Sequence, residues 1–282
     1  MSFIKLIIVK KLFSAVAIIL IFCTGFTSCK KEAATNSEEI PQSVKAQIYA
    51  AGFGTSNIQK VEEGYLVEGD IILTPEWLNN NPARQILRTA TGEQYHTTNL
   101  VTGLPRTISL SLSNKLLNKP GFYESLQETS NRFNAVPGFD GITFTIAAAG
   151  RGNINFVEGK FSTNTILATS GFPNSRGEPY GTVKVNSSAM NSYPTPDWIS
   201  FLAHLFSHEI GHCIGFRHSD WFDRSLGGCG GGNEGEGGAG AILIPGTPAA
   251  PDVDIDSWMI SCLNWPGHSF SDYDKIALAY LY

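Results

Sequence analysis

The sequence predicts an α+β fold, because short strands with alternating polar and apolar residues precede a long apolar helix. Alternation marks strands at residues 107–112, 142–146, 153–157 and 181–186. Two helices are expected before the cleft, over residues 120–135 and 195–215. The second begins with a Thr-Pro-Asp sequence that is typical of a helix start. A hydrophobic content of 42% is enough to build a sizeable core.

The N-terminal residues predict export and a lipid anchor. Basic residues (Lys5, Lys10 and Lys11) precede an apolar run over residues 12–22, which is short for a membrane span. The following Phe-Thr-Ser-Cys, ending at Cys29, resembles a bacterial lipoprotein signal, in which Cys29 would carry the lipid. Residues 1–29 are therefore interpreted as the signal and polar residues 30–43 as a flexible tether. We expect a cell-envelope lipoprotein, at the outer membrane or cell surface; ordinary secretion and a single membrane anchor are the alternatives.

Residues 44–104 are interpreted as an N-terminal segment, a possible pro-region, ahead of a catalytic domain over residues 105–282. A helical pattern runs from Val44 to Ala51. A strand over residues 65–73 is interrupted at Gly69-Asp70. Polar residues 75–104 look like a connector, where cleavage would release the catalytic domain.

The predicted helix 195–215 carries the most informative motif of the chain. Residues 208–218 read HEIGHCIGFRH, which is H-E-x-x-H extended to H-x-x-G-x-x-H. Residues i and i+4 share one face of a helix, so His208 and His212 can direct two imidazoles at one point. Gly215 can take a positive φ and end the helix, which would bring His218 to the same point.

Three imidazoles with one open position predict a catalytic Zn²⁺ site held by His208, His212 and His218. Glu209 follows the first of these histidines, and in this motif it serves as the general base toward the attacking water. The alternative is an amphipathic helix with surface histidines. His204, one turn earlier, is either a further ligand or a packed histidine that supports the site.

A Ser-Trp-Met sequence at residues 257–259 strengthens the metal interpretation. Together with the long motif it resembles the metzincin clan of zinc peptidases, in which a methionine turn lies beneath the metal. Met259 would be that methionine, and the HEIGH variant resembles the dual-action HEIGH metallopeptidases. The resemblance implies a twisted, mixed, mostly parallel sheet, with the strand at 181–186 as its edge beside the cleft. It also implies that Leu263, Asn264 and Trp265 form a wall of the S1′ pocket.

A second resemblance concerns Asp70. Residues 67–71 (VEGDI) resemble a segment of astacin pro-peptides, in which an aspartate caps the zinc and keeps the enzyme inactive. This implies that Asp70 is a zymogen switch; the alternative is an ordinary Gly-Asp turn between strands. Ser219 after the third histidine and Ser261 after Met259 both differ from the astacin pattern.

Three cysteines, Cys213, Cys229 and Cys262, follow the export segment and permit one internal disulfide. We expect Cys262 to be one partner, with Cys229 or Cys213 as the other. At the C-terminal end, a helix over residues 269–282 is expected to begin at Ser271. Its apolar face would hold Ile276, Ala279 and Tyr280.

These observations predict a zinc-dependent endopeptidase that acts on protein or peptide substrates. The alternatives are a surface adhesin that retains a zinc fold, and a zinc hydrolase of a non-protein amide. Nucleic acid is not expected as a partner, because the net charge is −5 and the pI is near 5.7.

Overall fold

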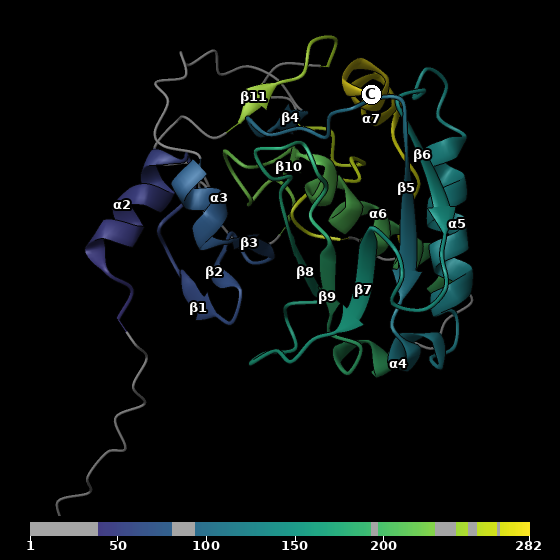
Figure 1. The fold of residues 1–282 in the computed structure, drawn as a ribbon, viewed down its shortest axis with the longest axis horizontal. Helices are drawn as coiled ribbons and strands as arrows, with labels where there is room; N and C mark the ends of the chain where they lie inside the picture. Colours follow the sequence, from purple (N-terminus) through teal and green to yellow (C-terminus); the bar gives the residue numbers. More distant parts are fainter. Residues whose placement is uncertain (1–38, 81–93, 193–196, 229–240, 248–252, 264–265) are drawn as a thin grey trace, which may run out of the picture. The chain divides into compact units, whose positions relative to one another are not determined.

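An eight-stranded mixed sheet is the centre of the fold (Figure 1). The computed structural model describes residues 39–80, 94–192, 197–228, 241–247, 253–263 and 266–282. Residues 40–282 form one compact unit. The predicted signal, Cys29 and most of the tether lie outside the described residues.

The sheet has the order β1-β2-β3-β8-β9-β7-β5-β6. Neighbouring strands run parallel from β9 to β6 and between β3 and β8, and antiparallel elsewhere. The predicted α+β class with a mixed sheet is confirmed. The strands are β1 (Gln59–Val61), β2 (Gly64–Val67), β3 (Ile71–Leu73), β5 (Arg106–Leu112), β6 (Ile142–Ile146), β7 (Ile154–Glu158), β8 (Ala168–Gly171) and β9 (Thr182–Val185).

A separate three-stranded sheet has the order β10-β4-β11. Its central strand, β4 (Tyr95–His96), pairs with β10 (Phe216–Arg217) and β11 (Ile242–Leu243). Phe216 and Arg217 belong to the HEIGH motif, so this small sheet holds the chain between the second and third motif histidines.

Two long helices pack together against the large sheet. They are α5 (Phe122–Asn134), which contacts β5 and β6, and α6 (Trp198–Ile214), which contacts β8 (Figure 1). The main core between them includes Phe122, Leu126 and Phe133 of α5, as the apolar pattern predicts. The shorter helical elements are α2 (Gln42–Ala50), α3 (Pro75–Asn80), α4 (Asn114–Leu117) and the 3₁₀ helix η1 (Ala189–Ser192).

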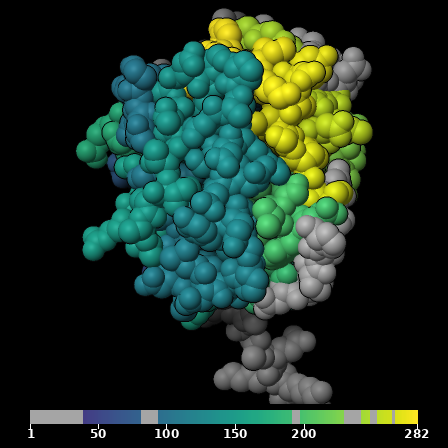
Figure 2. Space-filling view, turned by 90° about the vertical axis from the view of Figure 1, so that its right-hand side faces the viewer, coloured from purple at the N-terminus to yellow at the C-terminus, as the bar shows by residue number. Residues whose placement is uncertain are grey.

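The C-terminal helix α7 (Asp272–Leu281) starts at Ser271 with a capping box, as expected, because Ser271 and Asp274 bond each other's backbone N–H. On the face seen in Figure 2, the C-terminal segment lies beside the residues of the α4–β6 region. The predicted apolar face was wrong: Ile276 and Tyr280 are exposed, whereas Ala277 and Leu278 are buried. Among the described residues, we find no helix with the length and hydropathy that a membrane crossing requires.

The sheet edge beside the cleft was also assigned to the wrong strand. β9, predicted as the edge, lies between β8 and β7 in the interior of the sheet. β8, which sequence analysis missed, borders the motif helix through a bond from Ser170 Oγ to the Glu209 carbonyl (3.2 Å). Its sequence, Ala-Thr-Ser-Gly, lacks the β-branched and aromatic residues that mark most strands. The outer side of β8 pairs with β3.

A second apolar core lies under the N-terminal elements. Seven of its eight buried members come from residues 48–78, and the eighth is Phe172, just after β8. The main core draws its buried members from residue 101 onward. Residues 40–80 therefore have a core of their own, whereas Tyr95 of β4 pairs with motif strand β10.

Candidate metal centre

Helix α6 and the turn after it position the motif histidines. His208 and His212 are one turn apart on α6 and both are buried. Gly215 ends the helix in the left-handed region (φ 117°), which a side chain would disfavour. The chain then reverses through β10 and returns His218 toward the other two rings.

The three imidazoles converge on one point. His218 Nε2 lies 3.2 Å from His212 Nε2 and 3.3 Å from His208 Nε2. His208 Nδ1 donates to the Trp258 carbonyl (2.9 Å), and His212 Nδ1 donates to the Phe216 carbonyl (2.9 Å). These bonds place the ring protons on Nδ1, so the Nε2 atoms of His208 and His212 direct lone pairs into the cluster.

This geometry fits a tetrahedral metal ion. His218 Nε2 faces the lone pairs of His208 and His212 at 3.2–3.3 Å, and one shared cation would satisfy all three nitrogens. A zinc tetrahedron with metal–nitrogen distances of about 2.0–2.1 Å has edges of about 3.3 Å. The two separations from His218 Nε2 match those edges.

Asp70 places a carboxylate oxygen beside the three imidazoles from the turn of a β-hairpin. β2 and β3 are antiparallel, and residues 68–70 join them, with Glu68 at φ 54° and Gly69 at φ 93°. Asp70 Oδ2 lies 3.1 Å from His218 Nε2 and 3.5 Å from His208 Nε2. The ligand atoms of Asp70 and the three histidines all lie within 4.8 Å of one another.

The surrounding rings set the charge state of Asp70. Burial alone would raise the pKa of this carboxyl, but His218 and the bonds to His208 and His218 hold the pKa well below its usual range. Among the described residues, Oδ1 of Asp70 has no hydrogen-bond partner. A partly buried carboxylate together with three imidazoles is a ligand set that suits a divalent cation.

Glu209 lies beside this cluster and is fully buried. Burial raises the pKa of its carboxyl well above the usual range, and the Asp70 charge adds to that effect. Its Oε2 atom has no hydrogen-bond partner within the part of the chain that the structure describes. A carboxyl group in this environment is suited to take up a proton.

The turn that carries Met259 packs under helix α6. A Cβ at Gly211 would lie 2.4 Å from Met259 Sδ, so only glycine allows this approach. Asp220 holds the turn from the other side, accepting from Ser261 N (3.0 Å) and Ser261 Oγ (2.7 Å). Met259 is therefore held against Gly211 of α6, and its turn is held by Asp220.

Asp274 is the buried anchor of the same turn. Its carboxylate accepts bonds from Ser257 Oγ (2.9 Å), Trp258 N (3.0 Å), Gln94 Nε2 (2.7 Å) and Ser271 N (2.8 Å). Burial raises the pKa of Asp274 to about 7, against the opposing effect of these donors. The Trp258 carbonyl that receives His208 Nδ1 thus belongs to a turn held by a buried carboxylate.

Comparison with known proteins agrees with this geometry. The sequence profile described as dual-action HEIGH metallo-peptidase matches residues 66–282. The chain belongs to this family. Two solved structures of myroilysin also match, with 14% and 13% identity and TM-scores of 0.37 and 0.36. The matches cover 66% and 65% of this chain and 96% and 86% of those chains. No curated protein matches the chain.

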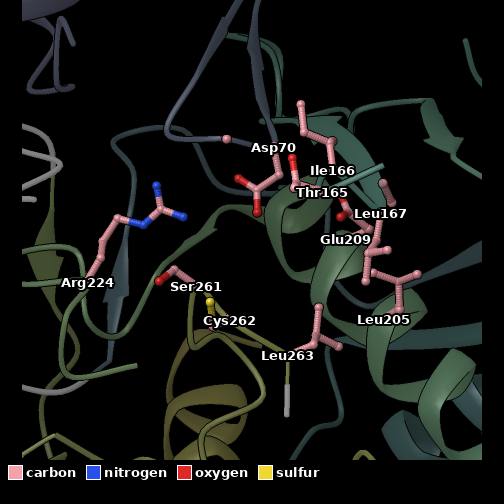
Figure 3. A pocket seen from close by; sticks show the side chains of 12 residues that line it. Asp70, Thr165, Ile166, Leu167, Leu205, Glu209, Arg224, Ser261, Cys262 and Leu263 are labelled. Atoms are coloured by element: carbon pink, nitrogen blue, oxygen red, sulfur yellow. The ribbon is translucent and has the colours of Figure 1, made fainter. Parts of the chain in front are cut away.

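The HEIGH metallopeptidase has a pocket of about 380 Å³ next to Glu209 (Figure 3). Leu167, Leu205 and Leu263 contribute apolar walls, and Asp70 and Arg224 line it as well. Leu263 was expected at this wall, whereas Asn264 and Trp265 lie outside the described residues. His204, expected to be either a further ligand or a packed histidine, is buried and lies outside the cluster; its Nδ1 accepts from His268 N (3.3 Å).

Cys262, at the same pocket, is disulfide-bonded. Cys213 is a free, buried thiol, so the alternative in which it pairs with Cys262 is wrong. Cys229, the other expected partner, lies outside the described residues. The apolar environment of Cys213 raises its pKa well above the usual range, which makes it a poor nucleophile.

Sequence analysis missed a buried ion pair beside the metal centre. Arg217 of β10 donates from Nη2 to Glu68 Oε1 (2.8 Å) and Oε2 (2.9 Å). Both side chains are almost completely excluded from solvent. The two residues are 149 positions apart, and the only signal in the sequence is that Arg217 directly precedes His218 and Glu68 lies two residues before Asp70.

Proposed function

We propose that this metallopeptidase is a zinc-dependent endopeptidase. The observation that carries the proposal is the convergence of three Nε2 atoms at the edge lengths of a zinc tetrahedron. A bound zinc ion would supply Lewis acidity, which lowers the pKa of water toward about 7 and polarises a carbonyl group.

The residues of the chain then have distinct roles. His208, His212 and His218 hold the metal through Nε2, and the Nδ1 bonds of His208 and His212 fix the orientations of those two rings. Glu209 takes a proton from the attacking water and delivers it to the leaving amine. Met259 and the turn anchored by Asp274 support the histidines from below.

We also propose that Asp70 keeps the full chain inactive. Its carboxylate lies where substrate and water need access to the cluster. β3 also pairs with the outer side of β8, with Ser170 N donating to the Asp70 carbonyl (3.0 Å). An extended substrate would pair with that same side of β8 as an added strand.

Replacement of Asp70 tests this latency. The full chain with Asp70→Ala should cleave a fluorogenic peptide faster than the unchanged full chain at equal zinc content. The reason is that the variant lacks the carboxylate that competes for the fourth position. Equal rates in the two proteins would contradict a switch at Asp70.

The pocket beside Glu209 is proposed as the S1′ subsite. Its walls of Leu167, Leu205 and Leu263 favour a medium-sized apolar side chain just after the cleaved bond. Leu263→Trp should reduce the cleavage of substrates with large residues at that position more than of substrates with alanine there. A uniform effect on both would count against this assignment.

One assay separates the endopeptidase from its alternatives. Casein and a peptide library are incubated with the protein, with and without a chelator, and the metal content is measured. Cleavage that stops on chelation and returns with zinc supports the endopeptidase. Metal binding without hydrolysis of protein would favour an adhesin that retains the fold, and hydrolysis of small amides alone would favour the other zinc hydrolase.

We further propose that the protein is exported and anchored through a lipid on Cys29. The disulfide at Cys262 supports export, because such bonds persist in oxidising compartments. Growth with radiolabelled palmitate should label the protein, and Cys29→Ser should remove the label. Equal labelling of both proteins would exclude Cys29 as the lipid site.

A further inference from the structure

Arg217 takes several partners from the N-terminal segment. Its guanidinium contacts both carboxylate oxygens of Glu68 through Nη2, donates from Nη1 to the Gly52 carbonyl (3.2 Å) and lies 4.1 Å from the centre of the Phe53 ring. Within the described part of the chain, every one of these groups comes from residues 52–68. Arg217 itself belongs to the peptidase body, one residue before the metal-cluster residue His218.

Glu68 is held in place at a conformational cost. It is one of the few described non-glycine residues with a positive φ (54°), a region that side chains disfavour. Its carboxylate nevertheless meets both Nη2 contacts at 2.8 and 2.9 Å, the geometry of a strong charge-assisted pair. The hairpin therefore places the Glu68 carboxylate against Arg217 and the Asp70 carboxylate against the histidine cluster.

The segment that supplies Glu68 shares little of its apolar core with the body. Its core consists of its own residues and Phe172, and the main core includes no buried member before residue 101. If residues 40–80 leave, Arg217 loses its carboxylate, its carbonyl partner and its ring contact at the same time. A guanidinium beside the cleft would then lack the anion that now neutralises it.

We propose that Arg217 forms a carboxylate-binding subsite for substrates once the hairpin has left. In this interpretation residues 68–73 occupy the cleft where a substrate would bind. β3 takes the position of an extended substrate on β8, and the Glu68 carboxylate takes the position of a substrate carboxylate on Arg217. The substrate class is proteins or peptides with a glutamate or aspartate within a few residues of the cleaved bond. This inference rests on the proposed endopeptidase function and on the proposed latency.

The test uses the full chain, folded first and then cut at a specific protease site placed between residues 80 and 94. Size-exclusion chromatography removes the released segment. The zinc-loaded body is then given peptide pairs that differ only by Glu or Gln at one position, from three before to three after the cleaved bond. We expect kcat/KM to favour Glu over Gln by about tenfold or more at one position.

Three variants identify the side chain that binds the substrate carboxylate. Arg217→Gln should bring the Glu-to-Gln ratio of kcat/KM to about one. Arg217→Glu should make a peptide with Lys at that position a better substrate than the Glu peptide. Arg176→Gln removes an exposed arginine after β8 and should keep the wild-type ratio. Zinc content, measured for each protein, shows whether the neighbouring His218 still binds.

Several results would overturn the inference. A Glu-to-Gln ratio near one at every position in an active body removes the subsite and leaves the endopeptidase intact. Loss of the ratio in Arg224→Gln, with Arg217→Gln unaffected, assigns the selectivity to Arg224, which lines the pocket. A segment that stays bound after cutting shows that Arg217 is a permanent structural partner. Cleavage of no peptide by the zinc-loaded body removes the proposed function and this inference with it.

Discussion

The ion pair between Glu68 and Arg217 makes a sharp prediction about latency. Glu68→Gln preserves the size of the side chain and removes its charge. Because the side chains of Arg217 and Glu68 are 0% and 1% exposed, solvent does not screen the loss. The variant would keep a guanidinium buried without its counter-ion as long as the hairpin stays on the cluster.

The free-energy cost of removing the Glu68 charge follows from this burial. Removal of one partner from a buried pair costs about 3–5 kcal/mol. The cost falls on the closed arrangement alone, because water can solvate Arg217 when the hairpin is displaced. Each 1.4 kcal/mol is about a tenfold change in an equilibrium constant, so the open-to-closed ratio should rise by about a hundredfold or more.

Steady-state cleavage of a fluorogenic peptide by the full chain measures that ratio, at fixed zinc content. Glu178→Gln is the matched control, because it makes the same substitution in the exposed pair with Arg106 (2.7 Å), where Glu178 is 56% exposed. Exposed pairs contribute at most about 1 kcal/mol, so this control should leave the rate unchanged.

A specific pattern would refute the reasoning. If Glu68→Gln lowers the thermal midpoint while the peptidase rate stays at the wild-type level, the pair stabilises the fold and does not hold the hairpin on the cluster.

Three further predictions concern the body of the peptidase. Glu209→Gln should retain zinc, measured by mass spectrometry of the metal, and lose about 10²–10⁴-fold in rate; retained proteolysis would exclude Glu209 as the base. Gly211→Ala should destabilise the protein by about 1–3 kcal/mol in urea unfolding, because the new Cβ meets Met259 and the Trp258 ring; an unchanged midpoint would contradict that contact. Asp274 has a folded-state pKa of about 7, above the value of 3.8 for an unperturbed aspartate, so the folded state binds its proton more tightly. Its contribution to stability should therefore fall as pH rises from about 4 to about 7, by up to about 4 kcal/mol, and Asp274→Asn should lack that slope. Parallel curves of stability against pH for the two proteins would be inconsistent with the shifted pKa.

The metal cluster could be predicted because its chemistry is local in sequence. His208, Glu209 and His212 share one helical turn, and the helix period alone brings the two histidines together. Gly215 predicts the end of the helix, and the short distance in sequence from Gly215 to His218 allows the chain to return His218 to the other two histidines. The turn at Gly69-Asp70 was also readable, since glycine and aspartate are common turn residues.

The missed features depend on pairing between distant segments. Ile71 pairs with Ser170 and Glu68 with Arg217, and no local pattern specifies which strands become neighbours. The apolar face of α7 was misassigned for another reason. Asp274 occupies the buried face because four donors satisfy its carboxylate, whereas Ile276 and Tyr280 are 42% and 58% exposed. A helical pattern based only on apolar residues cannot predict that a carboxylate lies on the buried face.

The parallel pairing of β3 with β8 has a consequence for ligand binding. The outer side of β8 has one row of backbone donors and acceptors, so β3 and a free extended peptide exclude each other there. A strand tethered within the same chain competes at an effective concentration on the order of millimolar. Short free peptides should therefore be weak competitors of the intact chain, whereas the same peptides should bind readily after the tether has been cut.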